Sequence, residues 1–130
     1  MTKLLLPIFY VGIGGFIGAA LRYLTTIAVH GISFTIPYGT LVSNIAGCFV
    51  IGIVMTLATG STMLSNEARL FLATGVCGGY TTLSSVVYEL ARFVDDGKLL
   101  NASVYFAATF VGAVIAFYLG TLLTTFLLRP

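Results

Sequence analysis

Long stretches without a charged residue constrain this chain more than any other feature. Residues 4–21, 23–66, 70–88 and 99–128 contain no Asp, Glu, Lys or Arg, and all 130 residues hold only ten such side chains. A soluble domain carries roughly a quarter charged residues, so ten cannot cover a globule of this length. Six scattered bases also form no patch for nucleic acid. The chain is therefore predicted to be an integral membrane protein embedded in a lipid bilayer.

The lengths of the apolar runs set the number of crossings. A membrane-spanning helix needs about 20 mostly apolar residues. The apolar runs are continuous rather than alternating, which favours helices over a β-barrel. The fold class is therefore all-α, with a single membrane domain over residues 1–130. Its four transmembrane helices are expected at about 4–29, 38–60, 68–94 and 99–127.

The six basic residues divide evenly between the two sides of a four-helix arrangement. An excess of Lys and Arg normally marks the cytoplasmic side, and an even division selects neither orientation. A weak local signal can then fix one orientation, or the chain inserts both ways and forms an antiparallel, dual-topology dimer, which is an inverted repeat made from one chain. One side holds Lys3, Arg69 and Arg129, and the other holds Arg22, Arg92 and Lys98.

The third predicted helix contains an unusual polar stretch. Gly78 and Gly79 are adjacent, and each glycine costs about 1 kcal/mol in a helix interior. Four hydroxyl residues follow, so we expect a helix broken at the bilayer midplane, where freed backbone groups line a site. The alternative is a kinked helix whose hydroxyls bond back to its own carbonyls. The hydroxyl residues are Thr81, Thr82, Ser84 and Ser85.

Stripes of small residues mark the first and last helices. Such stripes allow helices to approach closely in lipid. They indicate either close packing within the chain or a subunit interface. The first helix carries Gly14 and Gly18, and the last carries Ala108, Gly112, Ala116 and Gly120.

The polar residues form no catalytic set. His30 is the only histidine, so neither a metal cluster nor a catalytic triad has its parts, and the chain is not expected to be an enzyme. Glu89 and Arg92 are three residues apart near a helix end, which favours an ion pair at the membrane surface. Arg22 lies either at the interface or in an aqueous mouth, where it would attract anions. The other polar residues are neutral hydrogen-bond donors, which suits a pathway for a small anion.

Three segments resemble the fluoride channels of the Fluc (CrcB) family. Residues 14–23, GGFIGAALRY, are similar to the family's GGxxGAxxRY signature. Residues 39–47, GTLVSNIAG, resemble its GTLxxNxxG segment, and residues 74–82, TGVCGGYTT, resemble TGxxGGxTT. The three segments occur in the family's order and cover essentially the whole chain.

The resemblance implies a passive fluoride channel in the cell membrane, here a multi-pass protein of a bacterial or archaeal inner membrane. It implies an antiparallel dimer with two pores and a central structural sodium ion. Gly78 and Thr81 would give sodium-binding carbonyls, and Arg22 would lie near the aqueous vestibule. The residues expected along the fluoride pathway are Asn44, Ser84, Ser85, Tyr105 and Thr109.

Leu83 and Val86 depart from the family's pattern, which usually has phenylalanine at both positions. Several explanations stay open: a homodimer that conducts without these rings, one subunit of a heterodimer with a second family member, a pore with reduced or altered anion conduction, or substitutions made by engineering. A small multidrug-type exporter is a less favoured alternative, because that chemistry needs an acid in the first helix and residues 4–29 contain none.

Overall fold

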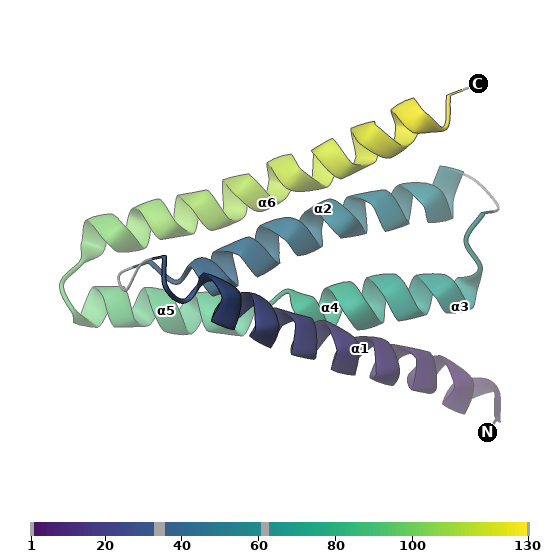
Figure 1. Cartoon of the computed structure of the whole chain (residues 1–130), viewed down its shortest axis with the longest axis horizontal. Coiled ribbons are helices and arrows are strands. Elements are labelled where there is room, and N and C mark those ends of the chain that lie inside the picture. The colour runs from purple at the N-terminus through teal and green to yellow at the C-terminus, as the bar shows by residue number, and fades with distance from the viewer. Residues whose placement is uncertain (1, 33–35, 61–62, 130) are drawn as a thin grey trace.

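The chain is all-helical in a computed structural model that describes residues 2–32, 36–60 and 63–129 (Figure 1). Within these residues, four helical segments are long and apolar enough to cross a membrane. Figure 1 shows both ends of the chain at the same end of the bundle, with the turn between α5 and α6 at the other. The elements are α1 (Thr2–Val29), α2 (Tyr38–Gly60), α3 (Asn66–Arg69), η1 (Leu70–Cys77), α4 (Gly78–Tyr80), α5 (Leu83–Asp95) and α6 (Leu99–Leu127).

The third span, formed by α3, η1, α4 and α5, leaves the helical conformation at two residues. Thr81 has φ −88° and ψ 156°, and Thr82 has φ −154° and ψ 120°, so both are extended. Both residues lie in the stretch of glycine and hydroxyl residues where a break was expected, and Gly78 and Gly79 themselves are helical. Gly79 serves a different purpose, because a Cβ there would lie 2.4 Å from the carbonyl oxygen of Gly15 in α1.

Close helix contacts depend on glycine. A Cβ at Gly18 of α1 would lie 2.1 Å from the carbonyl oxygen of Val76 in η1, and one at Gly120 of α6 would lie 2.2 Å from that of Phe49 in α2. Apolar side chains gain little by leaving lipid, so such close backbone approach is how membrane helices gain packing energy. These two glycines therefore serve packing within the chain, which is one of the two interpretations that their stripes allowed.

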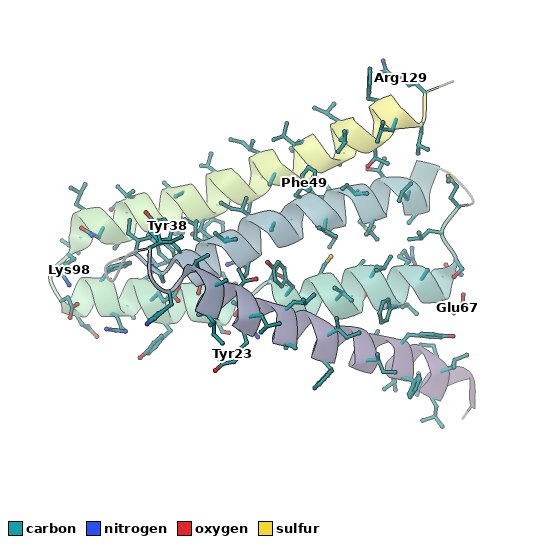
Figure 2. The ribbon with its side chains drawn as sticks, in the orientation of Figure 1. Tyr23, Tyr38, Phe49, Glu67, Lys98 and Arg129 are labelled. Atoms are coloured by element: carbon teal, nitrogen blue, oxygen red, sulfur yellow. The ribbon has the colours of Figure 1, made fainter. Side chains whose placement is uncertain are left out.

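Three of the charged residues mark the two ends of the bundle. Figure 2 shows Lys98 at one end, and Glu67 and Arg129 at the opposite end. Between them, α5 and α6 enclose a small apolar core of Val86, Phe93, Ala102 and Tyr105. The outer faces carry many exposed Leu, Ile, Val and Phe side chains, as expected for a surface that contacts lipid.

Substituting Gly18 by alanine is expected to destabilise the fold. The added methyl group meets main-chain atoms of η1 and α4, and overpacking of this kind costs about 1–3 kcal/mol. Thermal unfolding in detergent measures the effect. Gly12→Ala is the matched control, because a Cβ at Gly12 has no neighbour within 4 Å. Equal unfolding temperatures for the two variants would contradict the close approach of α1 to the third span.

Candidate functional site

A row of buried polar side chains runs between α2, α5 and α6. Thr40 and Asn44 are four residues apart in α2, so they share one face of that helix. Both are buried, and Thr109 of α6 is buried as well. A cavity lies at each end of this row, with volumes of about 470 Å³ and 210 Å³.

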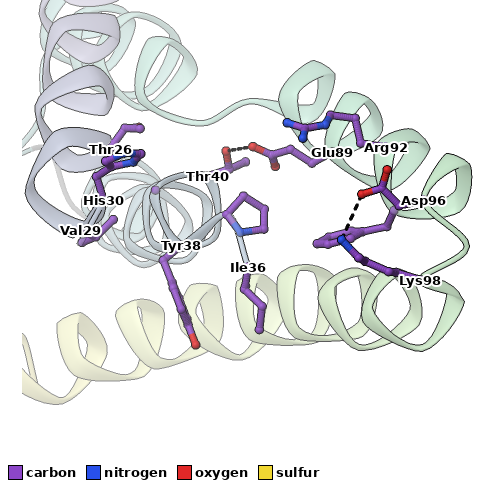
Figure 3. A pocket seen from close by; sticks show the side chains of 13 residues that line it. Thr26, Val29, His30, Ile36, Tyr38, Thr40, Glu89, Arg92, Asp96 and Lys98 are labelled. Atoms are coloured by element: carbon purple, nitrogen blue, oxygen red, sulfur yellow. Dashed lines mark hydrogen bonds and ion pairs between the residues drawn. The ribbon is translucent and has the colours of Figure 1, made fainter. Parts of the chain in front are cut away.

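The larger cavity lies where α1 ends and α2 begins, opposite the end of α5. Figure 3 shows Glu89 and Arg92 of α5 on one side of it and Thr26 and His30 of α1 on the other. Lys98 pairs with Asp96 at 3.1 Å. The cavity is thus an open recess at one end of the bundle, with acids and bases at its border and apolar side chains over much of its wall.

Glu89 is held by two hydroxyl groups. Thr40 Oγ1 donates a hydrogen bond to Oε1 at 2.6 Å, and the Tyr105 hydroxyl donates to Oε2. The ring of Tyr105 is 1% exposed and meets Phe93 edge to face, with the centroids 5.9 Å apart. The expected pairing of Glu89 with Arg92 is therefore not the contact that holds this carboxylate. Both hydroxyls come from other helices, so local spacing could not reveal them.

The smaller cavity lies at the extended residues of the third span. It brings together Asn44 and Thr109, two of the residues expected along the pathway, with Thr81, Leu83 and Val86. Leu83 is 63% exposed, whereas Val86 is 1% exposed. The other residues that line this cavity are Cys48, Thr82, Phe110 and Ala113, and Thr82 is one of the hydroxyl residues that the sequence marks beside the expected break.

Side chains from two other helices bind the backbone around the extended residues. Asn44 Oδ1 accepts a hydrogen bond from the Thr82 amide at 2.7 Å, and Asn44 Nδ2 donates to the Thr82 carbonyl at 3.1 Å. Arg22 Nε donates to the Gly79 carbonyl at 3.2 Å. Arg22 is thus bound to the third span, and it does not line the larger cavity.

The remaining residues expected along the pathway lie outside both cavities. The Ser84 and Ser85 hydroxyls are bonded to Thr82 Oγ1, at 3.1 Å and 3.2 Å. Tyr105 lies between the cavities, where its hydroxyl binds Glu89. Thr109 Oγ1 donates to the Tyr105 carbonyl at 2.8 Å.

The backbone carbonyls of Gly78 and Thr81 lose their usual helical donors where the span becomes extended. The Thr82 amide, which would bond the Gly78 carbonyl in a continuous helix, donates to Asn44 instead. The Ser85 amide, which would bond the Thr81 carbonyl, donates to Thr82 Oγ1 at 3.2 Å. Carbonyl oxygens of this kind fit a hard cation such as sodium. Among the described residues, no group of three or more His, Cys, Asp or Glu could hold a metal ion.

These features define a small multi-pass membrane protein with neutral donors around a cavity in its third span. Residues 9–121 match the family described as "CrcB-like protein, Camphor Resistance (CrcB)". The chain belongs to this family, which confirms the predicted family; the family is one of ion channels and not of enzymes.

Proteins named "Fluoride-specific ion channel FluC" are similar along most of the chain. One from Chlorobium phaeobacteroides is 45% identical over 111 residues, covering 85% of this chain and 86% of the relative. One from Clostridium novyi is 41% identical over 128 residues, covering 92% and 97%. "Fluoride-specific ion channel FluC 1" from Methanosarcina acetivorans is 42% identical over 113 residues, covering 87% and 86%.

Proposed function

We propose that this chain is a channel through which fluoride leaves the cell passively, down its electrochemical gradient, across a bacterial or archaeal inner membrane. The observation that carries the proposal is the smaller cavity, where Asn44, Thr82 and Thr109 meet beside the extended residues of a membrane span. The pathway joins the larger cavity to the smaller one along the row of Thr40, Tyr105 and Thr109. Membership of the family supports fluoride as the ion.

The chemistry of this row suits a small, strongly hydrated anion. Such an ion gives up water only where hydrogen-bond donors replace it. The Asn44 amide at one end of the row has an N–H beyond the one bound to Thr82, and the Thr40 and Tyr105 hydroxyls donate to the one acid of the row, Glu89. These hydroxyls offset part of the carboxylate's charge. A passive channel also needs no group that couples transport to protons or to ATP.

The proposed working unit is an antiparallel dimer with two pores. Its support is the even division of basic residues, together with both chain ends lying at one end of the bundle (Figure 1). Reporters fused to the C-terminus should be found on both sides of the membrane. A single orientation would exclude the antiparallel homodimer, and a heterodimer with a second family member is the alternative.

The chain alone, purified and reconstituted into liposomes loaded with potassium fluoride, is expected to release fluoride rapidly. Liposomes loaded with chloride should release little, because chloride gains less from closely spaced donors. Fluoride and chloride electrodes, with valinomycin to balance charge, measure the release of each ion. Release only after a second family member is added would instead support the heterodimer. No release under either condition would refute the fluoride channel.

The Gly78 and Thr81 carbonyls of two copies are proposed to hold a structural sodium ion. A bound sodium ion supplies a fixed positive charge beside the anion pathways. Sodium is therefore expected to raise the unfolding temperature in detergent, relative to N-methylglucamine at equal ionic strength. A ligand that binds only the folded state stabilises it by mass action. Equal unfolding temperatures in the two cations would contradict the sodium site.

A phenylalanine is expected to be accepted at position 83 and rejected at position 86. Leu83 is largely exposed beside the smaller cavity, whereas Val86 is part of the apolar core with Phe93 and Tyr105. Leu83→Phe should fold normally and release fluoride faster, and Val86→Phe should lower the unfolding temperature by overpacking. Leu99→Phe, at an equally exposed position outside both cavities, is the control for flux. Unchanged or slower release by Leu83→Phe would contradict a role for a ring there.

A further inference from the structure

The two hydrogen bonds between Asn44 and the Thr82 backbone fix the positions of Oδ1 and Nδ2 of the Asn44 amide. A backbone N–H can only donate, and a backbone carbonyl can only accept. The Thr82 amide therefore requires the oxygen of Asn44, and the Thr82 carbonyl requires its nitrogen. An isolated asparagine amide can turn either end towards an ion, but this one cannot turn without losing both bonds.

The two bonds to Thr82 leave one N–H of the Asn44 amide without a role in them. Its nitrogen carries two hydrogens, and the Thr82 carbonyl takes one of them. The Thr81 and Thr109 hydroxyls, which also line the smaller cavity, donate to the Cys77 and Tyr105 carbonyls at 2.9 Å and 2.8 Å. The second N–H of Asn44 is thus a donor beside the cavity that these bonds do not use.

We propose that the Thr82 backbone acts as a positioning group that holds Asn44 with a donor, and never its oxygen, towards the smaller cavity. Arg22 supports this arrangement by binding the Gly79 carbonyl three residues earlier, which fixes the chain entering the extended segment. The arrangement favours anions over cations through orientation, without a positive charge at the cavity. Its effect on transport rests on the proposed fluoride channel, whereas the pairing itself does not.

Two substitutions at Asn44 distinguish its bond from the Thr82 amide from the N–H that it directs towards the cavity. Asn44→Asp keeps the bond from the Thr82 amide, loses the bond to the Thr82 carbonyl, and has no N–H for the cavity. Hydrogen exchange at the Thr82 amide should stay within about threefold of the wild type, while fluoride release falls at least tenfold. Asn44→Leu removes both bonds, so exchange at Thr82 should rise at least tenfold as well. Amide exchange is followed by mass spectrometry on overlapping peptides across residues 78–88.

Matched controls use the same changes elsewhere. Asn101→Asp and Asn101→Leu, in α6 and outside both cavities, should leave Thr82 exchange and fluoride release unchanged. Arg22→Gln should raise exchange at Thr82 several-fold, and Arg69→Gln, with the same loss of charge at the start of the third span, should not.

Fluoride release by Asn44→Asp at the wild-type rate would overturn the donor role, and unchanged Thr82 exchange in Asn44→Leu would overturn the pairing. If the wild type releases no fluoride, either alone or with a second family member, the proposed channel fails, and exchange still decides whether the pairing holds Asn44.

Discussion

A backbone that leaves the helical conformation inside a bilayer must find other partners for its N–H and C=O groups, because lipid offers none. The third span meets this requirement with side chains from two other helices. Asn44 of α2 supplies both a donor and an acceptor to Thr82, and Arg22 of α1 supplies a donor to Gly79. The extended residues therefore exist only as part of the bundle. The same bonds divert the amide that would otherwise donate to the Gly78 carbonyl, so one set of contacts shapes the cavity wall and leaves that carbonyl without its helical donor.

Glycine makes these long-range bonds geometrically accessible. Gly47 lies three residues after Asn44 in α2. A Cβ at Gly47 would lie 2.3 Å from Thr81 Cγ2, so α2 contacts the extended residues directly. On the other side, Gly18 and Gly79 bring α1 and α4 into backbone contact. With larger residues at these positions the helices would separate, and neither Asn44 nor Arg22 would reach its partner. Close packing of the helices and hydrogen bonding of the extended backbone therefore depend on each other in this fold.

The four helical spans were predictable because long apolar runs separated by turn residues determine them, and the family was predictable because its motifs combine glycines and polar residues at fixed spacing. The position of the extended residues was not. Gly78 and Gly79 suggested a break, but a glycine serves close contact as well as flexibility, and sequence alone does not separate the two uses. The partner of Glu89 was predicted wrongly for a related reason. Arg92 is its neighbour on the helix, whereas Thr40, which binds it in the fold, is 49 residues away in the sequence. Asn44 was predicted as a polar residue of the pathway. Its bonds to Thr82 could not be predicted, because they depend on how α2 packs against the third span.

Leu83 and Val86 occupy equivalent positions in the sequence motif but different environments in the fold. Leu83 projects beside the cavity and belongs to no core, so its identity can change without repacking the chain. Val86 is enclosed with Phe93, Ala102 and Tyr105, and Tyr105 in turn binds Glu89. A ring at position 86 would therefore disturb the hydroxyl that holds the carboxylate. Among the residues lining the smaller cavity, the aromatic one is Phe110 of α6. The aromatic ring beside this cavity therefore belongs to α6, whereas α5 contributes Leu83 and Val86 to the same wall.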